Sequence, residues 1–289
     1  MSGDADAVFL AHRPMVVAIG YDITGSVADA EDVAQQAYLR WAGAAGDVRH
    51  PRAWLARCAT NLAIDVLRGR DRVDYVGPWL PEPLPTSDFP AVGTDAAESA
   101  ELAEAVSVAL QVALQALSPL ERAALLLHDV FAFGHDEVAE MLGRTPAAVR
   151  QLVSRARAHA RDPVRRQAID RAAHRELADR FLAAAAGLDL DALTALLADD
   201  VRLVSDGGGV KAATRRPVVG RDAVLRFVFG LIEKSAGRLG VTPSELNLCP
   251  GLLVTLDGEL DLAWGFVIEQ GQITQILMQR NPAKLVHLQ

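Results

Sequence analysis

The sequence has few cysteines and no long apolar run. Its 289 residues include two cysteines, Cys58 and Cys249, which lie far apart in apolar surroundings. They form neither a disulfide framework nor a metal-ligand spacing, so we expect no metal and a reducing cytoplasm. No apolar stretch approaches the roughly 18 residues that cross a bilayer, which excludes an integral membrane protein. The acidic start, MSGDADAVFL, lacks a basic region, so we expect no signal peptide.

Aromatic residues are also scarce, at 5%, but apolar residues make up 51% of the chain and charged residues 23%. This composition excludes a disordered polypeptide, because there is enough apolar material to form cores. At roughly 100–200 residues per domain, the length predicts two or three domains.

Charge is segregated along the chain, although the net charge is −8. Between residues 141 and 166, arginines are opposed only by Asp162. Between Glu82 and Glu104 there are acidic residues but no lysine or arginine. Screening confines each charge to about 8–10 Å. The arginine-rich segment is therefore able to bind phosphate within an acidic chain.

Residues 8–72 have the pattern of helices. Ser26 is suited to an N-cap with Asp29 in the first turn, and apolar residues follow at helical spacing. A second helix is expected to begin at Pro51, with Trp54 on its core face. From about Asp74 the periodicity stops, because repeated prolines forbid a continuous helix. We expect residues 74–94 to be extended and docked on another part of the protein; a proline-rich spacer is the alternative.

Helical patterns return from about residue 96 to residue 166. Ser118, Pro119 and Glu121 combine an N-cap, a first-turn proline and a capping-box acid. Two short helices joined at Gly143, the second of them rich in arginine, then predict a helix-turn-helix. An ordinary packing unit with solvated arginines is the alternative. The one-sided charge favours DNA binding.

In that geometry the second helix enters the major groove. Its first turns supply the candidates for contact with base edges, which are Arg150, Ser154 and Arg155. The candidates for phosphate contact are Arg144, Arg157 and Arg161.

The remainder of the chain, from about residue 169, has the pattern of an α+β domain. Helices are expected at 176–186, 190–198 and 221–235. Strands are expected at 201–209, within 210–220, and at 246–250, 251–258, 260–271 and 272–280. Asp257-Gly258 and Gln270-Gly271 predict hairpin turns. Helices followed by consecutive strands indicate a curved sheet packed on helices.

Two blocks of sequence resemble bacterial RNA polymerase sigma factors. AEDVAQQAYLRW and PRAWLARCATNLAIDVLRGR resemble regions 2.2 to 2.4, and the stretch from LSPLER to RARAHAR resembles region 4. Their order and spacing resemble those of the extracytoplasmic-function (ECF) subgroup. YVGPWLPEPL, SDGGG and NPAKL are similar to signatures of ECF members with a fused SnoaL-like domain.

The resemblance implies a multidomain fold, in which two all-α sigma domains precede an α+β cone-shaped barrel. The implied boundaries are 1–74 for the region 2 helical bundle, 75–108 for the acidic linker, 109–166 for the region 4 helix-turn-helix domain and 169–289 for the SnoaL-like domain. The implied partners are promoter DNA and core RNA polymerase. The linker is implied to thread through polymerase channels that otherwise hold nucleic acid.

The resemblance also implies roles for residues. The face that grips the clamp helices of the polymerase largest subunit is implied to be Asp29, Asp32, Gln35 and Gln36, although many relatives carry an acid where Gln36 stands. Asn61 lies where relatives read a base flipped from the −10 strand, and an amide suits a Watson–Crick edge. Arg52, Arg57 and Arg68 are implied to bind that strand's phosphates. Trp54 is a further candidate, for stacking on the strand.

The Asp206-Gly207-Gly208 turn is not a P-loop, because the Gly-Lys-Ser/Thr ending is absent. We expect it to make a regulatory contact between domains together with Trp79 and Asn281. A pocket lined by Asp206, Lys211, Trp264 and Asn281 is the other hypothesis. It would take a small ligand or support a cyclase or isomerase tethered to DNA. We favour a non-enzymatic regulatory module without a cofactor over that enzyme, and over a plain repressor.

Overall fold

The computed structural model describes residues 2–70, 75–85, 111, 113–159, 171–187, 189–235, 237–247 and 249–288. The chain divides into two compact units. The first unit contains the helices up to α8, and the second contains residues 75–85 together with the elements after α8. Arg161 and most of the acidic linker lie outside the described residues.

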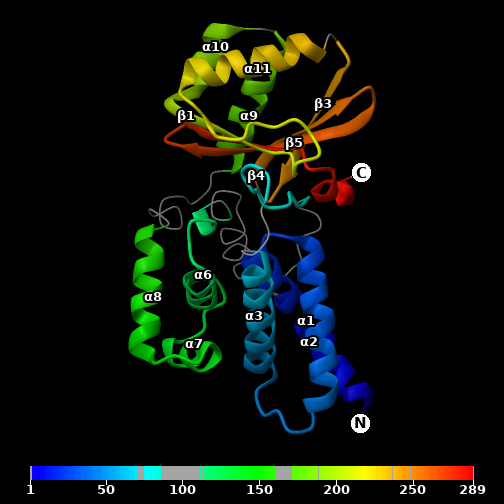
Figure 1. The fold of residues 1–289 in the computed structure, drawn as a ribbon, viewed down its shortest axis with the longest axis vertical. Coiled ribbons are helices and arrows are strands. Elements are labelled where there is room, and N and C mark those ends of the chain that lie inside the picture. Colours follow the sequence, from blue (N-terminus) through cyan, green and yellow to red (C-terminus); the bar gives the residue numbers. More distant parts are fainter. Residues whose placement is uncertain are drawn as a thin grey trace. The chain divides into compact units, whose positions relative to one another are not determined.

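Three packed helices open the first unit: α1 (Ser2–Thr24), α2 (Val27–Ala44) and α3 (Pro51–Arg70) (Figure 1). The expected N-cap of α2 is confirmed, because the Ser26 hydroxyl accepts a hydrogen bond from the Asp29 amide at 3.3 Å. Gly20 lets α1 and α2 approach closely, since a Cβ on it would lie 3.0 Å from the Ala30 Cα. Trp41 and Leu55 are fully buried where the helices meet.

The second half of this unit consists of α6 (Pro119–Leu125), the π-helix η2 (Leu126–Val130), α7 (His135–Leu142) and α8 (Pro146–His159). The predicted helix-turn-helix is confirmed. Ser118 and Glu121 form the expected capping box, and Gly143 adopts the left-handed conformation with φ of 62°. The Thr145 hydroxyl caps α8 by accepting from the Ala148 amide at 3.2 Å. The π-helix was not predicted.

The second unit is a six-stranded sheet with three helices. Helices α9 (Arg171–Ala186) and α10 (Leu190–Leu196) precede β1 (Leu197–Asp206), and β2 (Val218–Val219) leads into α11 (Arg221–Ser235). The remaining elements are β3 (Leu239–Leu246), β4 (Cys249–Leu256), β5 (Glu259–Glu269), β6 (Gln272–Gln279) and the 3-10 helices η3 (Pro282–Lys284) and η4 (Val286–Leu288). The strand order is β2-β1-β6-β5-β4-β3, and only β1 and β6 are parallel. The predicted α+β class is confirmed.

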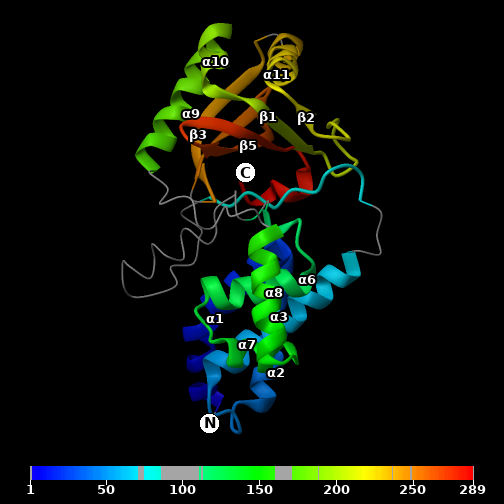
Figure 2. The same cartoon turned by 90° about the vertical axis from the view of Figure 1, so that its left-hand side faces the viewer.

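The two faces of this sheet carry different elements (Figures 1 and 2). Helices α9, α10 and α11 cover one face and complete the apolar core with Phe181, Trp264 and Phe266. The chain segment 75–85, which we call the linker segment, lies on the other face beside η3 and η4. Neighbouring residues on a strand therefore point to different surroundings.

Two strand predictions differ from the structure in their bounds. Residues 246–250 were expected to be a strand, but Asn247 has φ of 51° and forms the turn between β3 and β4. The preceding strand, Leu239–Leu246, contains Pro243, which is tolerated because β3 is an edge strand. Within 210–220 the strand is only Val218–Val219. The two predicted hairpin turns are confirmed, with positive φ at both residues of each.

Candidate functional site

The exposed face of α8 carries the three candidate base-contacting side chains. Arg150, Ser154 and Arg155 are exposed and line a shallow, open depression of about 570 Å³ with Ala147 and Gln151. Val149, Leu152 and Val153 on the opposite face are buried in the helix-turn-helix core. The arrangement presents a polar, cationic helix face of the kind that enters a major groove.

The remaining arginines of this module differ in how they are held. Arg157 donates to both carboxylate oxygens of Asp129, at 2.9 and 2.6 Å, and this interaction raises the pKa of Arg157. It therefore ties α8 to η2. Arg144 is exposed, and its guanidinium donates to the Gly143 carbonyl at 3.3 Å.

On α3, the three described candidates after the first turn lie along the helix surface. Arg57 is exposed, and Asn61 is half-buried with no hydrogen bond to its side chain within the described residues. Arg68 pairs with Asp65 at 3.3 Å, where both are exposed. Trp54 is half-buried beside Trp41, at 5.7 Å between ring centroids.

Arg52 is placed differently from the other α3 arginines. Its guanidinium donates to the Phe131 carbonyl at 2.8 Å and lies 4.2 Å from the centroid of the Phe133 ring. Both phenylalanines belong to the helix-turn-helix half of the first unit, so Arg52 joins the two halves of that unit.

On α2, the polar face contains Asp32, Gln35 and Gln36, and all three are exposed. Leu39 extends this face by one turn and is 70% exposed, which sequence reasoning did not single out. Asp29 is half-buried and forms an ion pair with Arg70, so its carboxylate is engaged within the first unit.

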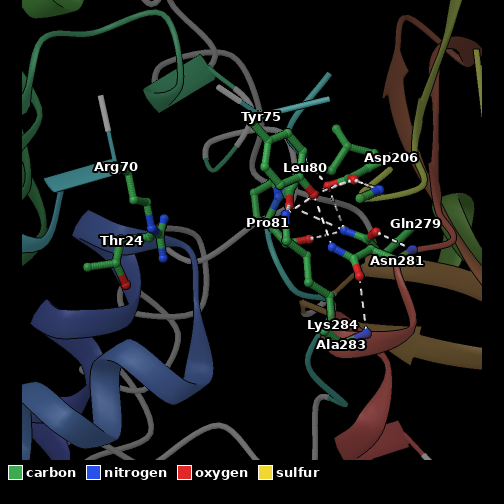
Figure 3. A network of polar contacts seen from close by, with 11 residues as sticks. Thr24, Arg70, Tyr75, Leu80, Pro81, Asp206, Gln279, Asn281, Ala283 and Lys284 are labelled. Atoms are coloured by element: carbon green, nitrogen blue, oxygen red, sulfur yellow. Dashed lines mark hydrogen bonds and ion pairs between the residues drawn. The ribbon is translucent and has the colours of Figure 1, made fainter. Parts of the chain in front are cut away.

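The linker segment is attached to the sheet of the second unit by a network of buried polar groups (Figure 3). Asp206 at the end of β1 is fully buried. It accepts hydrogen bonds from the Tyr75 hydroxyl at 2.6 Å, the Leu80 amide at 2.9 Å and the Gly208 amide at 3.0 Å. The Lys284 ammonium lies 2.7 Å from the same carboxylate.

Lys284 is the cation of this network and is 7% exposed. Besides Asp206, its ammonium donates to the Leu80 carbonyl at 2.6 Å. It also lies 3.9 Å from the Trp79 ring and 5.1 Å from the Tyr75 ring. Aromatic faces and a desolvated ammonium attract one another, so Lys284 contacts the linker segment by a hydrogen bond and two rings while its charge is paired with Asp206.

Amide side chains complete the attachment. Gln279 donates to the carbonyls of Leu80 and Pro81 at 3.2 and 3.3 Å, and Asn281 donates to the Tyr75 hydroxyl at 3.0 Å. At the other end, Leu84 and Asn247 exchange two hydrogen bonds of 3.0 and 2.7 Å. The expectation that this part of the linker is extended and docked is met by residues 75–85.

The glycines after Asp206 are required by close packing. A Cβ on Gly207 would collide with the Lys211 carbonyl, and one on Gly208 would collide with the side-chain amide of Asn281. Gly208 also has φ of 60°, which disfavours other residues. The structure therefore brings together Trp79, Asp206, Gly207, Gly208 and Asn281, the set expected to act between domains. Sequence reasoning missed Tyr75, Asn247, Gln279 and Lys284.

The hypothesis of one pocket lined by Asp206, Lys211, Trp264 and Asn281 is wrong. Asp206 pairs with Gln279 and lies on the linker side of the sheet, whereas Trp264 pairs with Met278 and belongs to the helix-side core. Lys211 forms an ion pair with Asp261 at 2.8 Å. Burial raises the pKa of Asp261, but hydrogen bonds and charge from Lys211 and Arg280 outweigh it and lower the pKa overall.

Comparison with protein families identifies both halves of the first unit. Residues 8–73 match Sigma-70 region 2, and residues 107–159 match Sigma-70, region 4. The chain is 36% identical to the ECF RNA polymerase sigma factor SigJ of Mycobacterium tuberculosis, over 96% of this chain and 91% of that protein. This chain belongs to the ECF sigma factors.

Similarity to other ECF sigma factors also covers the second unit. A probable ECF sigma factor of the same organism, SigI, is 28% identical over 96% of this chain and 94% of its own length. The crystal structure of M. tuberculosis SigJ aligns with a TM-score of 0.78 and 34% identity, covering 99% of this chain and 98% of SigJ. In the described part of this ECF sigma factor, no helix is both long and apolar enough to span a membrane.

Proposed function

We propose that this ECF sigma factor binds core RNA polymerase and directs it to promoters, acting in the cytoplasm with the polymerase. In this proposal α8 reads the −35 element through Arg150, Ser154 and Arg155. Asn61 reads a base of the −10 strand, and Arg52, Arg57 and Arg68 bind its phosphates. The exposed face Asp32, Gln35, Gln36 and Leu39 of α2 contacts the polymerase clamp helices.

The exposed cationic face of α8 is the observation that carries the proposal. Its side chains are presented outward as a duplex reader requires, with its apolar residues buried behind it. The phosphate-binding arginines make such binding salt-dependent, because each phosphate contact releases counterions.

The direct test is reconstitution with core polymerase. Purified protein should co-purify with core enzyme and start run-off transcription at a matching promoter. Gln35→Ala and Leu39→Ala together should weaken co-purification without changing binding of free duplex DNA. Tight duplex binding by a protein that never associates with core polymerase would refute the proposal.

We further propose that the second unit regulates the sigma half by binding the linker segment. The support is the buried network around Asp206 and Lys284, which fixes the position of a segment that directly follows α3 in the chain. Asp206→Ala should change the yield of run-off transcripts, whereas Lys211→Ala, in an ion pair outside the network, should not. Equal yields from wild type and Asp206→Ala would exclude this regulation.

The enzyme hypothesis receives less support. A general base must reach its substrate's proton, but the Asp206 carboxylate is fully buried and surrounded by hydrogen-bond donors from the linker and Lys284. Turnover of a small carbonyl compound, with transcription unaffected by Asp206→Ala, would favour the enzyme over the regulator.

A small ligand in the second unit is a separate proposal. Ser205 and Trp264 flank Met278 on the helix side of the sheet, and their buried polar atoms have no hydrogen-bond partner within the described residues. A ligand with an acceptor oxygen would satisfy these donors. Native mass spectrometry of the purified protein, with Ser205→Ala as the comparison, tests for such a ligand.

A further inference from the structure

The strand-binding end of α3 faces the helix-turn-helix half within the first unit. The two halves border a groove of about 860 Å³. Arg49, Arg52, Arg57 and Trp54 line it on the region 2 side, and Phe133, Glu137, Glu140 and Met141 line it on the region 4 side. Asp47 also lines the region 2 side, but the three arginines outnumber it, so a net basic and aromatic side faces one that is acidic and apolar.

Arg52 is the side chain that crosses this groove. Its hydrogen bond to the Phe131 carbonyl uses the guanidinium edge, and the Phe133 ring covers its face. A phosphate would need the same N–H groups. While these contacts persist, one edge and one face of the guanidinium are occupied, so Arg52 has fewer donors to offer a DNA strand.

The acidic side of the groove opposes a DNA strand independently of Arg52. Glu137 and Glu140 are exposed on α7, and Glu137 also caps the helix by accepting from the Gly134 amide at 2.8 Å. Carboxylates facing a strand's path raise the free energy of phosphate entry, because like charges repel across a few ångströms.

Two buried contacts hold the halves together away from the groove. The Arg122 guanidinium, which is 3% exposed, donates to the Ile23 carbonyl at 2.7 Å. The Gln111 amide donates to the Asp22 carboxylate at 3.0 Å. The exposed face of α8, with Arg150 and Ser154, is left uncovered by any of these contacts.

We propose that in the free protein the region 4 half blocks the strand-binding end of region 2 through Arg52 and the α7 carboxylates, while its own duplex-binding face stays open. The promoter contacts then become available in sequence, with the −35 duplex first and the −10 strand only after the halves separate. The Phe131 carbonyl is a neutral acceptor, so a charged phosphate replaces it once separation occurs. This inference rests on the proposed function of α3 and α8.

The test measures binding of a fluorescein-labelled mixed-sequence single strand to the full-length protein without polymerase. Phe133→Leu keeps an apolar side chain but removes the ring beneath Arg52, so single-strand affinity should rise about three- to tenfold. The matched control is Phe131→Leu, because Phe131 is equally buried but contributes only its backbone carbonyl to Arg52. It should bind as wild type does.

A second pair of variants tests the charge without touching the core. Glu140→Gln removes a carboxylate from the groove, whereas Asp136→Asn removes one from the same helix outside the lining residues. Glu140→Gln should raise single-strand affinity about twofold, and Asp136→Asn should not. Binding of a labelled duplex of the same length should be equal for all four variants.

Arg57→Ala separates the possible failures. If Arg57→Ala weakens strand binding but neither Phe133→Leu nor Glu140→Gln strengthens it, the blocking is refuted and the strand-binding role of α3 stands. If Arg57→Ala has no effect in either the wild-type or the Phe133→Leu background, the role of α3 itself is refuted. If Phe131→Leu and Asp136→Asn raised single-strand affinity as much as Phe133→Leu and Glu140→Gln, the blocking would also be refuted, because the effect would then be non-specific.

Discussion

Removing either member of the buried Asp206–Lys284 pair should release the linker segment from the second unit. The carboxylate is fully buried and the ammonium is 7% exposed, so deleting one partner leaves a charge in a low-dielectric environment. Such deletions cost about 3–5 kcal/mol. Lys284→Met keeps most of the side-chain volume, and Asp206→Asn keeps the shape of the carboxylate. The measured loss should therefore report charge rather than a cavity.

The double variant is the decisive measurement, because it leaves neither charge unpaired. We expect the double variant to lose less free energy of unfolding than the sum of the two single variants, by about 2–3 kcal/mol. Coupling of this size is typical of groups in direct contact. Lys211→Met is the matched control. Lys211 is 41% exposed, and its buried partner Asp261 keeps a second ion pair with Arg280 at 2.7 Å, so the loss should be smaller, at about 1 kcal/mol.

Hydrogen exchange at the Leu84 and Asn247 backbone amides provides the assay, because the first donates to the Asn247 side-chain oxygen and the second to the Leu84 carbonyl, and neither substitution touches them. A loss of about 3 kcal/mol predicts exchange at least about a hundredfold faster. Chymotrypsin should also cut after Tyr75 and Trp79 in the single variants. Wild-type exchange rates in both single variants would refute the conclusion that the Asp206–Lys284 pair attaches the linker segment. Strictly additive losses of unfolding free energy in the double variant would refute it as well.

Four further substitutions test other parts of the structure. Burial raises the pKa of Asp22 well above its usual value, so the free energy of unfolding of the wild type should fall as pH rises from the usual aspartate range to that raised pKa. In urea unfolding, Asp22→Asn should remove this pH dependence. An unchanged pH profile in the variant would contradict the role of Asp22. Gly208→Ala should lower the melting temperature more than Gly258→Ala, because both have positive φ but only Gly208 faces another side chain; equal losses would contradict the packing argument. Asn61→Ala should weaken promoter melting but not binding to core polymerase, and loss of both would indicate misfolding. Arg155→Ala should reduce the salt slope of duplex binding by about one if it contacts one phosphate, and an unchanged slope and sequence preference would remove it from the interface.

Local signals predicted local structure well. Ser26 and Ser118 each cap the helix that their position indicated, because an N-cap depends only on the next few residues. The hairpin at Asp257-Gly258 was found for the same reason. Asn247 forms a comparable turn, but no glycine follows it and apolar residues flank it, so it was taken for part of a strand.

The contacts that attach the linker segment and join the helical halves are long-range, and sequence patterns do not encode them. Tyr75 meets Asp206 and Asn281 only through the fold of the sheet, and Lys284 meets Trp79 in the same way. The resemblance to ECF members pointed to the three motifs without saying which side chains bind. Arg52 was assigned to phosphate from its place on α3, and its contact with Phe131 depends on how two helical halves pack.

The parallel pairing of β1 with β6 has a consequence during biosynthesis. These strands are separated by most of the second unit, and Lys284 follows β6. Domains generally fold in the order in which they leave the ribosome. The helices that approach the promoter therefore emerge before the surface that binds the linker exists. A nascent chain therefore passes through an interval in which Lys284 does not yet hold the linker segment, and proteolytic trimming just before Lys284 would remove that contact from a finished chain.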